Sequence, residues 1–274
     1  MENSKIKRAL LIILDGVGIG PIGDNNGWTL ADTPNIDLLL KDYPSAAIEA
    51  SGENVGLPKY QMGNSEVGHM IIGSGKIFKQ DLVIINEAIE DSSFFSNEAI
   101  LNAIFSAKEN NSSLHLLGLA SPGGVHSHIN HLLSILKICK SYGISPKLHL
   151  FTDGRDSDPK SSIEILDNLD KSLKEYGGEI YTISGRYYAM DRDQRWSRTE
   201  LAWDAIVNNK GETRKDYRDA INNSYAKGIT DEFILPTSLN CAKPLQKNDS
   251  LLFFNFRNDR TRQIARALNV ERFD

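Results

Sequence analysis

The stretch Lys147-Leu-His-Leu-Phe151, with the Thr152-Asp-Gly-Arg-Asp156 that follows it, decides the fold class. An apolar run of strand length ends here on three charges within four residues. Similar strand-like runs occupy 9–14, 113–119, 179–183 and 250–256. Helix-like segments lie between them, at 34–43, 129–142, 160–176, 197–209, 214–226 and 258–268. This alternation predicts an α/β fold with mainly parallel sheets flanked by helices.

Charged and polar side chains follow the ends of these strand-like runs. They are Asp15, His126, Asp153, Arg155, Asp156, Arg186 and Arg257. In open α/β sheets, ligands bind beyond the carboxyl ends of the strands. We therefore expect these residues at one edge of a sheet, or at the edges of two sheets that face a cleft.

The bulk composition excludes several classes of partner. The 274 residues carry a net charge of −5 and a pI near 5.7, which gives no general attraction to nucleic acid or to an anionic membrane. The apolar run 9–14 is shorter than a secretory signal requires, and no run approaches the about 20 apolar residues of a membrane span. The two cysteines form no disulfide framework. We expect a cytoplasmic protein.

A second informative stretch is Gln61-Met-Gly-Asn-Ser65-Glu-Val-Gly-His-Met70. It places Ser65 among small or turn-forming residues, which leaves room for attack on a substrate. A polar turn followed by the start of a helix explains the same residues equally well. The segment alone leaves both interpretations open.

Asp15 supplies a candidate metal ligand. It follows the apolar run and precedes a glycine-rich turn, and a carboxylate oxygen suits manganese or magnesium. Such an aspartate is by itself more often a cap at the end of a strand. A divalent metal would acidify the hydroxyl of Ser65 and screen the charge of a phosphoryl group.

Arginines supply candidate anion-binding groups. Arg155 lies between two carboxylates, which would fix its guanidinium for bidentate contact with a carboxylate or phosphate, and Asp156 could carry a substrate proton. Arg257 and Arg260 are three residues apart, so we expect them on one face of a helix near its N-terminus, where backbone amides also favour anions.

Three alternatives concern the remaining motifs. The arginines and aromatic residues of 186–198 could form an RNA surface, but the acidic chain favours two arginines on a small anion and two in surface pairs. His126, His128 and His131 could imitate a zinc cluster, or could be a helix cap and surface residues. Gly18-Ile-Gly-Pro-Ile-Gly23 matches a dinucleotide fingerprint, but loop-forming residues follow it instead of a helix.

Taken in order, these motifs resemble the cofactor-independent phosphoglycerate mutases of the alkaline-phosphatase-like superfamily. The resemblance is carried by 10–20, 61–70, 121–128, 152–156, 184–192 and 256–260. It implies that Ser65 carries the phosphoryl group and that Asp15 and Ser65 ligate manganese. It also implies substrate contacts from His126, Arg155, Asp156, Arg186, Arg192, Arg257 and Arg260, with Asp156 as the favoured proton carrier.

The implied activity is that of an isomerase of glycolysis and gluconeogenesis. It interconverts 3-phosphoglycerate and 2-phosphoglycerate through a phosphoserine intermediate, in a monomer that binds no nucleic acid or membrane. The implied domains are the start of a phosphatase-like domain at 1–79 and a substrate-binding transferase domain at 80–274.

Family members usually run to nearly twice this length, and only Asp15 and Ser65 of the implied metal shell lie here. We expect an N-terminal portion that is inactive alone. The alternatives are a metal-dependent phosphatase or phosphopentomutase-like enzyme, or a non-catalytic module that binds phosphate or glycerate.

Overall fold

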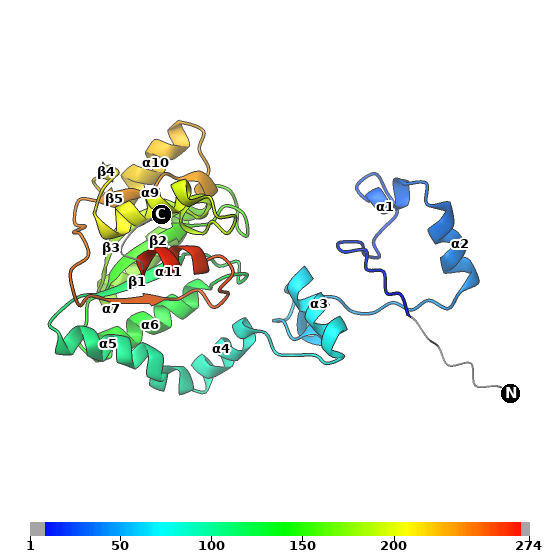
Figure 1. Cartoon of the computed structure of the whole chain (residues 1–274), viewed down its shortest axis with the longest axis horizontal. Coiled ribbons are helices and arrows are strands. Elements are labelled where there is room, and N and C mark those ends of the chain that lie inside the picture. The colour runs from blue at the N-terminus through cyan, green and yellow to red at the C-terminus, as the bar shows by residue number, and fades with distance from the viewer. Residues whose placement is uncertain (1–8, 270–274) are drawn as a thin grey trace. The chain divides into compact units, whose positions relative to one another are not determined.

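The protein is described by a computed structural model that covers residues 9–269 (Figure 1). The chain divides into two compact units, unit 1 within Met1–Gln80 and unit 2 within Asp81–Asp274. Within residues 9–269, none of the helices combines the length and the apolar character needed to cross a bilayer.

Unit 1 consists of short helices and loops. Its helices are α1 (Gly27–Leu30), α2 (Pro34–Asp42), the 3-10 helix η1 (Gly52–Val55) and α3 (Ser65–Ser74). The predicted helix at 34–43 is confirmed, with proline at its first position, where the missing N–H costs nothing. The buried core of the described part of unit 1 is small, because it contains only Val55, Leu57 and Val67, with Ile71 packed against them.

The predicted buried strand at 9–14 is wrong. These residues adopt no regular secondary structure, and Leu10 and Ile12 are 85% and 72% exposed. A strand needs hydrogen-bonding neighbours for its backbone, and no strand occurs in the described part of unit 1. The apolar sequence alone does not replace that partner.

Unit 2 is built on one six-stranded sheet. Its strands are β1 (Leu114–Leu119), β2 (Lys147–Thr152), β3 (Glu179–Gly185), β4 (Glu212–Arg214), β5 (Thr237–Leu239) and β6 (Ser250–Phe253), in the order β4-β5-β3-β2-β1-β6. All neighbouring strands are parallel except β3 and β5. The four strands that were predicted in this unit are present, and the mainly parallel α/β class is confirmed. The strands β4 and β5 were not predicted, because the three residues of each are too few to show a pattern.

Helices surround the sheet. They are α4 (Asp81–Glu90), η2 (Ser93–Ser96), α5 (Glu98–Glu109), α6 (Ile129–Ser141), α7 (Ser162–Tyr176), α8 (Arg186–Ala189), α9 (Trp196–Val207), α10 (Tyr217–Ala226), η3 (Asp231–Phe233) and α11 (Arg262–Leu268). The predicted helices at 129–142, 160–176, 197–209 and 214–226 are confirmed with small shifts of their ends.

The last helix begins later than predicted. A turn occupies the four residues before it, in which the Asn258 carbonyl accepts from the backbone N–H groups of Thr261 and Arg262. Arg257 and Arg260 therefore lie in the connection between β6 and α11, and the expectation that they share a helix face is wrong. The turn leaves Asp259 between them.

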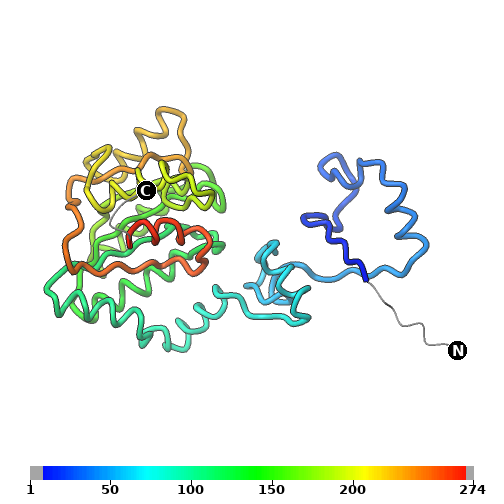
Figure 2. Tube along the Cα trace, viewed as in Figure 1, coloured from blue at the N-terminus to red at the C-terminus, as the bar shows by residue number. Residues whose placement is uncertain are grey.

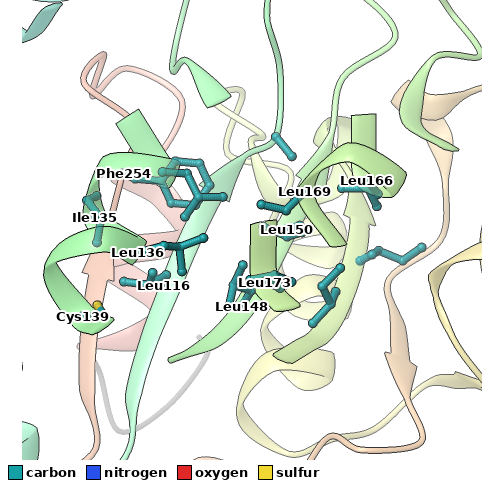
Figure 3. Packing of buried hydrophobic residues seen from close by; sticks show 14 of the residues in the cluster. Leu116, Ile135, Leu136, Cys139, Leu148, Leu150, Leu166, Leu169, Leu173 and Phe254 are labelled. Atoms are coloured by element: carbon teal, nitrogen blue, oxygen red, sulfur yellow. The ribbon is translucent and has the colours of Figure 1, made fainter. Parts of the chain in front are cut away.

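Both faces of the sheet are covered. Leu114 and Leu116 of β1 belong to a cluster with residues of α5, α6, α7 and α10, whereas Leu117 and Leu119 belong to a second cluster with α8, α9 and α11. Alternate strand residues point to opposite faces, so a strand covered on both sides reads as a continuous apolar run. Figure 3 shows the first cluster, where leucines of β1 and β2 meet leucines of α6 and α7.

The sheet order brings four strand ends together. The neighbours β3, β2, β1 and β6 run parallel, so the segments that follow them leave the sheet at the same edge. In Figure 2 the segment from β6 into α11 (orange to red) runs beside the green strands, although more than 100 residues separate β6 from β1. As expected, this edge carries His126, Asp153, Arg155, Asp156, Arg186 and Arg257.

Candidate functional site

In unit 1, Ser65 and Asp15 form a direct contact. The hydroxyl of Ser65 donates a hydrogen bond of 2.7 Å to Oδ2 of Asp15, and both side chains are exposed. Ser65 is the first residue of α3, and the Asn64 side chain caps that helix by accepting from the N–H of Val67. The structure is therefore compatible with both interpretations of this stretch, an accessible nucleophile and the start of a helix, because Ser65 is exposed and is also the first residue of α3.

Gly63 makes this turn possible. A Cβ atom at this position would lie 1.8 Å from the carbonyl oxygen of Ala50, so any larger residue would force the two backbone segments apart. Asp15 lies in a turn that does not follow a strand, which corrects its expected place at the edge of a sheet. Its contact with Ser65, fifty residues away, is made without that sheet.

The pair fits part of a metal-binding site. Two oxygen ligands of one small divalent ion lie about 3 Å apart when each is about 2.1 Å from the ion. The 2.7 Å separation of the Ser65 and Asp15 oxygens is compatible with two such positions. Among residues 9–269, however, no group of three or more histidine, cysteine, aspartate or glutamate side chains is arranged to hold a metal.

In unit 2, Arg186 lies between two carboxylates. Its Nη1 donates to Oδ1 of Asp153 at 2.6 Å and to Oδ2 of Asp156 at 2.5 Å. Burial alone would raise the pKa of Asp153, but hydrogen bonds from Ser121 and from the Asp156 N–H, together with the charge of Arg186, lower it. Asp153 and Arg186 therefore form a buried ion pair that fixes both of their side chains.

Arg155 does not occupy the place that the sequence predicted for it. Its side chain is 58% exposed and pairs with Glu232, with 3.5 Å between Nη1 and Oε1. Gly154 lies in a turn with a φ of 68°, and a Cβ atom at this position would lie 2.8 Å from the backbone nitrogen of Glu232. The chain therefore passes close to η3 at this turn. The arginine held between carboxylates is Arg186, which comes from the neighbouring strand end.

His126 is a buried, neutral imidazole beside this cluster. Its Nε2 lies 3.8 Å from Oδ2 of Asp156 and its Nδ1 lies 3.5 Å from Oδ1 of Asp259. Burial, followed by the positive charge of Arg186, lowers its pKa to about 4, although both aspartates oppose that shift. The imidazole can therefore accept a hydrogen bond at neutral pH.

Asp259 joins several of the predicted residues. Its Oδ2 accepts from Nη1 of Arg192 at 3.0 Å, and its Oδ1 lies 3.1 Å from Nε of Arg257. These contacts link the loop after α8 to the connection before α11. Burial, followed by the charges of Arg192 and Arg186, lowers the pKa of Arg260, which shows how densely positive charge is concentrated here.

A cavity of about 320 Å³ opens beside this arrangement. Four arginines line it, together with aromatic and acidic side chains: Arg155, Arg186, Arg198, Arg260, Tyr187, Phe233, Met190, Asp191, Asp193 and Glu232. The volume suits a small metabolite, since ligand cavities usually begin at about 300 Å³. Cationic walls of this kind suit an anion.

Comparisons with known proteins show the family of the chain. The family model described as "BPG-independent PGAM N-terminus" matches residues 85–274, which is more than half of the chain. The chain belongs to this family.

Curated relatives and a solved structure extend the match beyond the family model. The 2,3-bisphosphoglycerate-independent phosphoglycerate mutase of Clostridium novyi is 49% identical over 98% of this chain and 54% of its own length. The enzyme of Clostridium tetani is 52% identical over 98% of this chain and 53% of its own length. A crystal structure of Leishmania mexicana phosphoglycerate mutase at low cobalt concentration has a TM-score of 0.86 at 32% identity, and the match covers 96% of this chain and 51% of that one. The chain thus spans about half the length of the curated relatives it matches.

Some residues that lie at the site were not predicted to be functional from the sequence. Asp259, Glu232 and Tyr187 lie at the site, and Arg198 was expected only as one of four arginines in its stretch. Asp259 could have been predicted from the sequence, because it lies between Arg257 and Arg260, which were both predicted to contact the substrate. Nothing local pointed to Glu232, which η3 brings to the cavity from a distant segment.

The histidines that imitate a zinc cluster have separate contacts. His128 caps α6, because its Nδ1 accepts a hydrogen bond from the N–H of Asn130. This agrees with the alternative in which one of these histidines is a helix cap. His131 is buried, and its Nε2 lies 2.9 Å from Oδ1 of Asn86. Burial, followed by the charge of His128, lowers the pKa of His131 to about 4.

Proposed function

We propose that this chain supplies the nucleophile and the substrate-binding unit of a 2,3-bisphosphoglycerate-independent phosphoglycerate mutase. The reaction interconverts 3-phosphoglycerate and 2-phosphoglycerate. The observation that carries the proposal is the arginine-lined cavity beside the Asp153–Arg186–Asp156 cluster, in a member of this family.

The cavity suits phosphoglycerate because that ligand carries a carboxylate and a phosphate on a short carbon chain. Guanidinium groups bind both anions through paired N–H donors. Arg155, Arg186 and Arg260 line the cavity, and Arg192 and Arg257 are held nearby through Asp259. The neutral imidazole of His126 adds a hydrogen-bonding group that brings no charge of its own.

Asp156 is the proposed proton carrier. Its carboxylate is 20% exposed, whereas that of Asp153 is 1% exposed and is saturated by Ser121, Arg186 and backbone N–H groups. A substrate hydroxyl can reach only the former. Arg186 holds this carboxylate in place while it takes and returns the proton, and the imidazole of His126 lies 3.8 Å away.

Ser65 is the proposed acceptor of the phosphoryl group in unit 1. The carboxylate of Asp15 accepts the hydrogen bond of the Ser65 hydroxyl and so orients its lone pairs for attack on phosphorus. Asp15 and Ser65 would also ligate manganese or another divalent ion such as magnesium. When bound, that ion supplies acidification of the hydroxyl and screening of phosphoryl charge.

The cellular setting follows from the same proposal. The enzyme would act in glycolysis and gluconeogenesis in the cytoplasm, as a monomer with a small-molecule substrate. The net charge of −5 supports the absence of nucleic-acid and membrane partners.

Direct binding tests this function. We expect the chain to bind 3-phosphoglycerate in isothermal titration calorimetry, and Arg260→Ala to weaken binding about ten- to a hundredfold. Lys174→Ala is the control, because Lys174 is an exposed cation that pairs with Asp170 on α7. Absence of binding by the parent chain, or equal affinity in Arg260→Ala, contradicts the proposal.

Turnover separates the mutase from a binding module. A chain extended to the length of its relatives should convert 3-phosphoglycerate to 2-phosphoglycerate when manganese is present. Binding without turnover in that extended chain would favour the non-catalytic alternative.

A further inference from the structure

Arg198 is held against the wall of the cavity by aromatic stacking. Its guanidinium carbon lies 3.7 Å from the centre of the Tyr187 ring. Tyr187 in turn contacts the rings of Phe233 and Tyr188, each with 5.1 Å between ring centres. The stack fixes the plane of the guanidinium, so little side-chain entropy remains to be lost when it binds a ligand.

The positive charge of Arg198 is only weakly compensated. Its Nη1 lies 3.5 Å from Oδ1 of Asp191, compared with 2.6 and 2.5 Å in the two ion pairs of Arg186. The other oxygen of Asp191 accepts from the N–H of Arg195 and from the side chain of Gln263. The aspartate is thus shared among several donors.

The four arginines of the cavity therefore differ. Arg186 is neutralised by two carboxylates, and Arg155 is paired with Glu232. Arg260 has a buried Nε that lacks a hydrogen-bond partner among residues 9–269. Arg198 and Arg260 are consequently the two cavity cations whose charge is most available to a ligand.

We propose that Arg198, stacked on Tyr187, forms a second anion subsite that makes the cavity select ligands with two anionic groups. This inference rests on the proposed function, since it assigns one end of a phosphorylated carboxylic acid to Arg198 and leaves the other end to Arg260. A ligand that spans both subsites gains from both cations, whereas a single anion gains from one.

The selectivity of binding tests the subsite. Titration calorimetry of the whole chain with 3-phosphoglycerate, inorganic phosphate and glycerate gives the preference for the doubly anionic ligand over the better of the other two. We expect Arg198→Ala to reduce that preference about ten- to a hundredfold. Arg198→Lys keeps the charge without the planar stack, so its preference should be intermediate.

Arg218→Ala is the matched control. Arg218 also lies beside a tyrosine ring, that of Tyr217 at 5.0 Å, and pairs with Asp167 at 2.8 Å, but it is not part of the cavity wall. The control should keep the parent preference. Thermal melting of each variant reports any general loss of folding.

The possible outcomes separate the two proposals. If the parent chain binds none of the three ligands, the proposed function fails. If the parent prefers 3-phosphoglycerate and Arg198→Ala retains the same preference, even with lower absolute affinities, the second subsite is overturned while the proposed function stands. A purely structural role for Arg198 would lower all three affinities together.

Discussion

Residues 10–14 and 114–119 are two apolar runs that differ in burial. The first, Leu-Leu-Ile-Ile-Leu, is largely exposed in unit 1, although it is the more continuously apolar of the two. The second, Leu-His-Leu-Leu-Gly-Leu, is the buried strand β1 of unit 2, and its Leu116 and Leu117 have no exposed surface. Apolar composition permits a buried strand, but neighbouring strands and covering helices are what produce one.

The two units also differ in how they hold reactive groups. In unit 1, Ser65 and Asp15 are both exposed and meet through one hydrogen bond. In unit 2, Arg186 and Asp153 are buried and belong to a network that joins the ends of β1, β2 and β3. Mutation and exchange experiments can therefore test whether chemistry and stability are divided between the units.

The largest effect expected is on turnover. In a chain extended to the length of its relatives, Ser65→Ala should lower mutase activity on the order of 10⁴–10⁶-fold, because it removes the proposed acceptor of the phosphoryl group. Binding of 3-phosphoglycerate should persist, since unit 2 holds the cavity. Steady-state kinetics and calorimetry measure the two effects, and Ser74→Ala on the same helix is the control. Activity within tenfold of the parent would contradict the proposal that Ser65 of unit 1 accepts the phosphoryl group.

Hydrogen exchange addresses the two apolar runs directly. Amides of 114–119 should exchange only through global opening, and those of 10–14 should exchange almost freely, because they belong to no strand ladder. A stability of at least about 5 kcal/mol gives a difference of about 10⁴-fold or more. Mass spectrometry of peptic fragments measures it. Equal protection of the two runs would show that 10–14 is paired in solution.

A pair of leucine substitutions tests the energetic side of the same comparison. Leu116→Ala should lower the free energy of unfolding by about 2–5 kcal/mol, because it leaves a cavity in the core. Leu11→Ala should change it by about 0.5 kcal/mol or less, since Leu11 is exposed. Urea titration followed by circular dichroism measures both. A large loss from Leu11→Ala would mean that the first run is buried after all.

The smallest effect expected concerns acid. The pKa of His131 is about 4 in the folded protein because burial disfavours its charged form, whereas an unfolded histidine has a pKa of about 6.5. Between these values the unfolded chain binds more protons, so the free energy of unfolding falls as the pH is lowered from 6.5 to 4.

His131→Gln should reduce this loss of stability in acid by about 1–3 kcal/mol. The contributions of the other histidines whose pKa is lowered by burial, among them His126 and His149, remain. His69→Gln, at an exposed position in unit 1, is the control and should leave the acid dependence of unit 2 unchanged. Thermal melts at a series of pH values measure the effect. An acid dependence identical in His131→Gln and the parent would mean that His131 is already charged or exposed in the folded unit.

Much of unit 2 was predictable, because its elements are long enough to show their period. β2 and α7 appear close to their expected positions, and the polar residues after the strands gather at one edge as the parallel topology requires. The strands β4 and β5 were not predicted, since a strand of three residues is too short to show an alternation of apolar and polar side chains. The connection before α11 was also misjudged, because the Asn258 carbonyl closes a turn before the helix begins.

The sequence by itself determined the α/β class and the family, because periodicity and motif order are properties of neighbours along the chain. Only the tertiary structure decided which partners those residues have. It placed Arg186, not Arg155, between the carboxylates, set Asp259 among Arg192, Arg257 and His126, and left 10–14 without a sheet. Burial and electrostatic energy depend on distance in space, and that distance is fixed only when strands and helices far apart in the sequence pack together.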